Sequence, residues 1–167
     1  LNSYIKTLVT FAHLAEENGL TPFLLNHEGD EDGEVIKDVI KQFGKPLEVI
    51  KEENPLMVKG IIQSSRLAIC SRYHGCISAL SSGKPCIGTS WSHKYERLYD
   101  EYNAEQLLIN PDMTKDQLND VLLIALDKES EVAEKISINA KLFKQETELL
   151  WQEVKSIVDT VNSDLVK

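Results

Sequence analysis

Two short polar stretches hold the side chains best suited to chemistry. Ser71, Arg72, His74 and Gly75 fall within five residues, and residues 90–94 read SWSHK. A guanidinium such as that of Arg72 is a planar fork that matches a carboxylate or a phosphate. An imidazole such as that of His74 donates to an oxyanion or transfers a proton near neutral pH. These residue types together predict a site for a small anion.

Each polar stretch follows a segment with the character of a buried strand. Residues 66–70 (RLAIC) precede the first stretch, and residues 85–89 (PCIGT) precede the second. A helix of small residues is expected over 74–82, opened by Gly75. The backbone N–H groups of its first turn would attract an anion. Ligands of parallel α/β sheets bind beyond the carboxyl ends of the strands, so we expect both stretches in one crevice.

The rest of the chain alternates between strand-like and helix-like segments. Strand-length apolar runs lie at 22–26, 46–50, 66–70, 85–89 and 105–109, and helical spacing lies between them and throughout the residues beyond 130. Asn54 and Thr114 are expected to cap helices. Strict alternation of this kind predicts an α/β fold, a parallel sheet with helices on both faces. His27 follows the first predicted strand and therefore joins the candidate crevice.

The C-terminal part predicts a helical tail over 129–162, attached to a single domain that comprises 1–167. A helix of about 30 residues would be about 45 Å long, which exceeds the size of a small domain. The tail should therefore bend or reach toward another domain. The chain also begins with Leu1 and not with Met. We therefore expect it to be the C-terminal half of a longer two-domain protein.

Composition and charge exclude several classes of function. The 167 residues carry a formal net charge of −9, which argues against a general binder of nucleic acid or of anionic membranes. The three cysteines include no C-x-x-C pair, so buried, reduced thiols in the cytoplasm are expected and a zinc site is not. The acidic run at 28–32 is interpreted as a solvated loop, and no metal site is predicted. No apolar run reaches the length of a membrane span, and no signal peptide is recognised.

Each candidate residue also has a purely structural interpretation. Arg72 could belong to a surface ion pair, His74 could cap a helix and His27 could simply be part of a loop. His13 lies inside the first predicted helix and is expected to be structural. Trp91 suits packing as well as it suits stacking on a ligand.

The same segments resemble the signature of the polysaccharide pyruvyl transferase family. The likeness rests on Ser71-Arg72-Tyr73-His74-Gly75, on Ala79-Leu80, and on the stretch from Gly83 to Lys94, which contains G-K-P, G-T-S-W and a following lysine. The predicted strand that ends in His27, with Asp30 or Asp32 behind it, is similar to a second region of the family. The resemblance runs from about residue 4 to residue 110 and is most specific over 71–94.

The resemblance implies a fold, a reaction and roles for residues. Members have a two-domain fold similar to GT-B glycosyltransferases, so this chain would be one Rossmann-like half without its N-terminal partner. They transfer a pyruvyl group from phosphoenolpyruvate to a sugar of a cell-surface polysaccharide or of its lipid-linked precursor. Phosphoenolpyruvate is the donor substrate and no further cofactor is implied. A lipid-linked acceptor leaves peripheral association with a membrane open.

Carried over to this sequence, the family pattern makes His74 the catalytic proton donor. Arg72 would hold the donor, and Trp91 is a stacking candidate. The other anion-binding candidates are Ser71, Gly75, Lys94, Ser90 and His27. A half of this kind would bind the donor weakly and would not catalyse by itself.

Two other classes of function remain open at this level. The first is the nucleotide-sugar-binding half of a GT-B glycosyltransferase, for which Trp91 is the one stacking platform in view. The second is a non-catalytic interaction domain that would use the apolar stripe between Ile136 and Val161. Burial and pairing of Arg72 and His74 inside the fold would favour the interaction domain.

Overall fold

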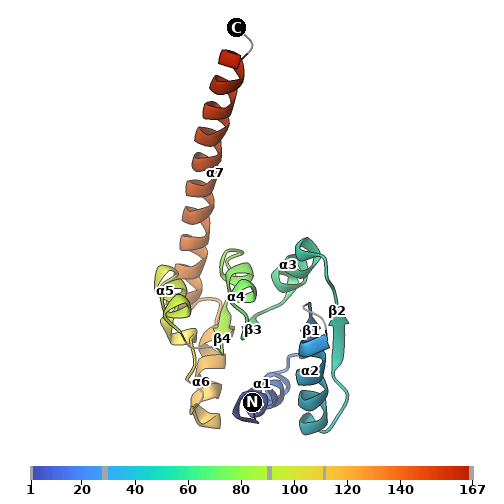
Figure 1. Cartoon of the computed structure of the whole chain (residues 1–167). Coiled ribbons are helices and arrows are strands. Elements are labelled where there is room, and N and C mark those ends of the chain that lie inside the picture. The colour runs from blue at the N-terminus through green and yellow to red at the C-terminus, as the bar shows by residue number, and fades with distance from the viewer. Residues whose placement is uncertain (1, 28–29, 90–91, 111, 166–167) are drawn as a thin grey trace.

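The computed structural model describes residues 2–27, 30–89, 92–110 and 112–165 (Figure 1). The elements, in chain order, are α1 (Asn2–Glu17), β1 (Phe23–Asn26), α2 (Asp30–Phe43), β2 (Glu48–Lys51), α3 (Pro55–Ser64), β3 (Ala68–Cys70), α4 (Tyr73–Leu80), β4 (Cys86–Gly88), α5 (His93–Glu101), the 3-10 helix η1 (Glu105–Leu107), α6 (Lys115–Leu126) and α7 (Glu131–Leu165). Strands and helices alternate as far as α5, which confirms the α/β class.

The strands form two short parallel pairs. β1 pairs with β2 in the register Phe23 to Glu48, and β3 pairs with β4 in the register Ala68 to Cys86. Within the described residues each sheet has two strands, so the structure does not confirm one continuous Rossmann-like sheet. All the described pairings are parallel, as the alternating sequence predicts.

The predicted fifth strand at 105–109 is wrong. Residues Glu105–Leu107 form a 3-10 turn, closed by the Leu107 N–H donating to the Ala104 carbonyl at 2.9 Å. Only an isolated bridge between Gly88 and Leu108 follows it. Leu107 and Ile109 are nevertheless buried. A short apolar run indicates that its residues are buried, but buried residues occur in tight turns as well as in strands.

Helix α2 begins earlier than the sequence suggested. The acidic segment that was interpreted as a solvated loop overlaps its start, because the helix begins at Asp30. Asp32 suits its place in the first turn, since the N-terminal end of a helix carries partial positive charge. The start of α2 follows β1 directly and so lies at the carboxyl end of that strand.

The predicted helix caps are confirmed. Asn54 precedes Pro55, and its side-chain oxygen accepts from the Leu56 N–H at 2.9 Å. Thr114 and Gln117 form a reciprocal capping box at the start of α6. Both caps satisfy backbone N–H groups that have no acceptor inside the helix.

Helix α7 has 35 residues and would measure about 52 Å at 1.5 Å per residue. Its first turns pack into the core, where Ile136 and Ala140 are buried. Phe143 packs edge-on against Tyr102, the C-cap residue of α5, with ring centroids 5.2 Å apart. Beyond that contact the helix projects away from the rest of the protein (Figure 1). None of the helices in the described part of the chain is long and apolar enough to cross a membrane.

Candidate functional site

The connection from β3 to α4 positions the central candidates. Arg72 is the N-cap residue of α4 and has extended backbone angles, φ −92° and ψ 134°. The Cys76 N–H donates to the Arg72 carbonyl at 3.1 Å. The N–H groups between them, in the first turn, therefore have no acceptor within the helix. The helix begins at Tyr73, two residues before Gly75, which corrects the expectation that Gly75 opens it.

The Arg72 guanidinium is held by a carboxylate from another element. Its Nη2 donates to Asp32 Oδ1 at 2.7 Å, and its Nε donates to Asp32 Oδ2 at 3.2 Å. The two side chains are 38% and 26% exposed, so the pair is only partly shielded from solvent. Asp32 lies in the first turns of α2. The pair therefore joins the carboxyl ends of β1 and β3, which belong to different sheets.

Ser71 is fixed by two tyrosines. Its hydroxyl accepts from the Tyr4 phenol of α1 at 2.8 Å, and its carbonyl accepts from the Tyr95 phenol of α5 at 2.7 Å. Burial raises the pKa of Tyr4 above its usual value, and the negative charge of Asp32 raises it further. Ser71 therefore anchors the loop, and its hydroxyl is engaged within the protein.

His74 points its imidazole into an accessible position. The residue is exposed, although Gly75 and Cys76 directly after it are buried. Its ring lies edge-on to that of Tyr73, with centroids 6.3 Å apart. An accessible imidazole beside the first turn of a helix can reach a bound ligand and exchange a proton with it.

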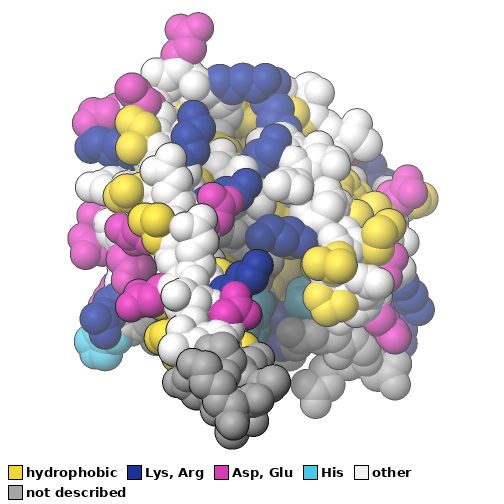
Figure 2. Space-filling view, turned by 90° about the horizontal axis from the view of Figure 1, so that it is seen from above, with side chains coloured by type: hydrophobic (Ala, Val, Ile, Leu, Met, Phe, Trp, Pro, Cys, Tyr) yellow, Lys and Arg dark blue, Asp and Glu magenta, His cyan; other side chains and the backbone are white. Residues whose placement is uncertain are grey.

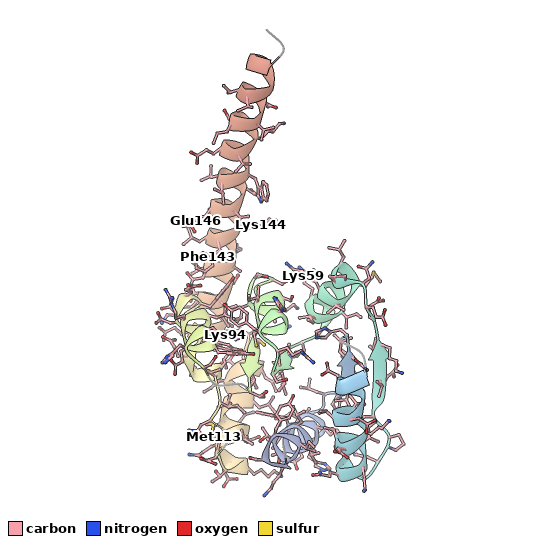
Figure 3. All side chains as sticks on the ribbon, viewed as in Figure 1. Lys59, Lys94, Met113, Phe143, Lys144 and Glu146 are labelled. Carbon is pink, nitrogen blue, oxygen red and sulfur yellow. The ribbon has the colours of Figure 1, made fainter. Side chains whose placement is uncertain are left out.

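Lys94 reaches the same loop from the start of α5 (Figure 3). Its ammonium lies 5.1 Å from the ring centroid of Tyr73 and 5.4 Å from that of Tyr95. The two rings are themselves edge-on, with centroids 5.4 Å apart. Contact with aromatic faces restrains a flexible ammonium while it keeps its charge. Lys94 is exposed, so a second cation is available near His74.

A layer of small groups and thiols supports the loop from behind. A Cβ at Gly75 would lie 3.1 Å from Cys70 Sγ, so only glycine lets α4 approach β3 this closely. Cys76 and Cys86 are buried, and all three cysteines are free thiols. Hydrogen bonds from the neighbouring thiols and burial raise the pKa of Cys86. These cysteines are packing groups, as expected from the sequence.

Basic side chains gather on the face above these elements. Figure 2 shows Lys and Arg side chains around a hollow in the middle of this face, with His side chains at its edge. Lys59 of α3 lies at the C-terminal end of α4, where its Nζ donates to Ser81 Oγ at 3.5 Å, and Lys144 lies on α7 (Figure 3). The positive charge here contrasts with the net charge of −9 for the whole chain. A small anion would therefore find a favourable local field on this face.

The remaining candidate residues from the sequence lie in another loop or outside the described part of the chain. His27 is half-buried and directly follows β1, in the connection to α2. Ser90 and Trp91 lie outside the described residues. The described residues contain no group of three or more His, Cys, Asp or Glu side chains that could hold a metal ion. The arrangement of Arg72 and Lys94 suits an anionic ligand.

The sequence pattern underestimated Asp32 and missed Tyr4. Asp32 was noted within a run of acidic residues, but only the early start of α2 shows that it faces Arg72. Tyr4 lies 67 positions before Ser71, and no local motif connects them. Such contacts between distant segments depend on how α1 and α2 pack, which periodicity does not reveal.

Comparison with known proteins supports one family. The family model for polysaccharide pyruvyl transferase matches residues 1–93, which is more than half of the 167 residues. The matched range includes Asp32, Arg72 and His74 and stops just before Lys94. No curated protein and no solved structure matches the chain. The chain belongs to the polysaccharide pyruvyl transferase family.

Proposed function

We propose that this chain carries the donor site for transfer of a pyruvyl group from phosphoenolpyruvate to a sugar of a polysaccharide or of its lipid-linked precursor. The observation that carries the proposal is that two suitable side chains occur together at the N-terminus of α4: Arg72, which Asp32 holds in place, and His74, which is exposed. The family match supports the reaction class.

The donor chemistry suits the cations of this loop. Phosphoenolpyruvate carries a phosphate and a carboxylate, and both are ligands for a guanidinium fork and for helix N–H groups. Arg72 provides the fork and Lys94 provides a second positive charge that is restrained by two tyrosine rings. In this proposal Arg72 and Lys94 hold the anionic groups, while Ser71 and Gly75 shape the loop beneath them.

The exposed imidazole of His74 is assigned the proton transfer. An acceptor hydroxyl oxygen forms a bond to C2 of the donor, and a proton adds to the methylene carbon C3, which becomes a methyl group. A second hydroxyl then bonds to C2, the bond from C2 to the phosphate oxygen breaks, and inorganic phosphate leaves. The product is a cyclic ketal. The two hydroxyls release one proton each, so one proton is gained by C3 and one by the departing phosphate, and His74 delivers one of these two protons.

We also propose that this chain is the donor-binding half of a two-domain, GT-B-like protein. The exposed apolar residues along the second half of α7 support it, because a surface of this kind is more stable when another surface covers it. The other half would then supply the acceptor side of the cleft.

Calorimetric titration with phosphoenolpyruvate tests the donor site. We expect binding by the native protein and loss of binding by Arg72→Ala. Arg97→Ala is the matched control, because Arg97 is an exposed arginine on α5 and removes the same charge. Absence of binding by the native protein, together with binding of a UDP-sugar, would replace this proposal with a nucleotide-sugar enzyme.

A non-catalytic interaction domain is the second candidate, and two observations favour it: the exposed face of α7 and the ion pair of Arg72 with Asp32. Val161, 52% exposed, lies near the far end of that face. The accessibility of His74 speaks against this alternative, since an interaction domain has no need of an exposed imidazole at a strand end. Donor binding that depends on Arg72 would exclude it.

A further inference from the structure

The pairing of Asp32 with Arg72 carries an inference about donor recognition that rests on the proposed function. The contact is bidentate, with donor-to-acceptor distances of 2.7 Å and 3.2 Å. The partners are 40 positions apart in the chain and come from α2 and from the cap of α4. A two-point contact fixes the plane of a guanidinium as well as its position.

An unrestrained arginine would be a poor first contact for a small anion. Its side chain has high rotamer entropy, and that entropy is lost when a ligand immobilises it. Arg72 does not use its side chain to cap α4, so the helix itself does not orient the guanidinium. The carboxylate of Asp32 removes much of this freedom before any ligand arrives.

The negative charge of Asp32 should weaken donor binding, which is opposite to the effect of orienting Arg72. A carboxylate beside a donor site repels phosphate and carboxylate groups, and the pair is only partly shielded from solvent. If Asp32 served only as a counter-charge, its removal would strengthen donor binding. If it sets the orientation of Arg72, its removal would weaken donor binding. The two roles therefore predict changes of opposite sign.

We infer that Asp32 is a positioning residue that holds the Arg72 guanidinium in the plane needed to grip the phosphoenolpyruvate anion. It acts through Arg72 and does not itself bind the donor. In this arrangement α2 and α4 contribute jointly to one donor contact. Movement of α2 relative to α4 would then change donor affinity.

The test compares Asp32→Asn with Asp38→Asn. Asparagine has nearly the same shape as aspartate but offers one acceptor oxygen, so the two-point contact is lost. Asp38 is an exposed aspartate on the same helix, and its substitution removes the same charge away from Arg72. The readouts are the Kd for phosphoenolpyruvate by calorimetry and the melting temperature, measured on this chain, and kcat and KM in turnover, measured on the chain together with its proposed second half.

We expect Asp32→Asn to raise Kd and KM by about tenfold to 100-fold, the range for misplacing a positioning contact, with a smaller change in kcat. Asp32→Glu should recover part of the affinity, because it restores a two-oxygen acceptor. Asp38→Asn should leave Kd within about twofold.

The outcomes separate this inference from the proposed function. Unchanged or tighter binding by Asp32→Asn, in a protein whose native form binds phosphoenolpyruvate, would overturn the positioning role and leave the donor site standing. No binding by the native protein would overturn the proposed function and the positioning role with it. A lowered melting temperature with normal donor affinity would assign Asp32 to stability alone.

Discussion

The loop after β3 and the second half of α7 place their side chains in opposite settings. In the loop, Ser71 and Arg72 are half-buried and tied to α1, α2 and α5 by hydrogen bonds and an ion pair. On α7, Leu150 and Trp151 are 58% and 65% exposed although both are apolar. Polar groups are therefore held firmly in one region, and apolar groups are left without cover in the other.

The contrast shows that side-chain type does not by itself decide burial. The apolar stripe of α7 continues in helical spacing from Ile136 to Val161. Ile136 is buried, whereas Val161 is exposed, because only the first turns of α7 pack into the hydrophobic core. The loop after β3 stays in place because side chains from three separate elements, α1, α2 and α5, hold it. Three changes would sharpen or break this comparison.

The largest effect is expected at His74. His74→Ala or His74→Gln should lower kcat by about 100-fold to 10,000-fold, the range for loss of a positioned proton donor. The Kd for phosphoenolpyruvate should change little, since Arg72 and Lys94 remain. Calorimetry on this chain checks the affinity, and turnover assays of the chain together with its proposed second half check kcat.

Lys155→Ala serves as the control from the other region, because Lys155 is an exposed polar residue on the projecting part of α7, and it should keep native turnover. Equal loss of turnover and of donor affinity in His74→Ala would remove the proton-transfer role from His74.

The next effect compares two isoleucines on one helix. Ile136 is fully buried and Ile157 is 58% exposed. Ile136→Ala should lower the free energy of unfolding by about 2–5 kcal/mol, because it leaves a cavity in the core. Ile157→Ala should change it by less than about 0.5 kcal/mol. Urea unfolding of both variants measures the difference.

A loss at Ile157 as large as that at Ile136 would show that the exposed stripe is covered in solution. The comparison between the two regions would then fail. Concentration dependence of the midpoint would identify a second copy of the chain as the cover.

The smallest effect concerns two glycines. A Cβ at Gly88, at the end of β4, would lie 2.6 Å from Tyr99 Oη and 2.8 Å from Leu108 Cδ1. Gly88→Ala should therefore destabilise the protein by about 1–3 kcal/mol through overpacking. Gly60, within α3, has no atom within 4 Å of such a Cβ. Gly60→Ala should stabilise the protein by up to about 1 kcal/mol, because alanine favours the helix. Thermal unfolding that ranks the two variants the other way would contradict the packing described behind the site.

Local signals in the sequence were sufficient for most elements. Asn54 and Thr114 are side chains that satisfy helix N–H groups within a few residues, so their caps were predictable. The long helix beyond Ser130 followed from its unbroken spacing. The prediction of a strand at 105–109 failed because apolar residues can be buried in a turn as well as in a strand. Local chemistry thus determined where the capped helices α3 and α6 begin, and it did not determine the starts of α2 and α4 or how strands assemble into sheets.

The sequence by itself determined the composition of the candidate site: an arginine, a histidine and a lysine that follow two strands, in a pattern shared with one family. Only the tertiary structure decided that Asp32 holds Arg72 and that Tyr73 and Tyr95 flank Lys94. It also decided where the stripe of α7 passes from buried to exposed. The physical reason is the distance along the chain between the residues that make each contact. Caps and helical faces depend on residues a few positions apart, whereas ion pairs and packing depend on segments that meet only when the whole chain folds.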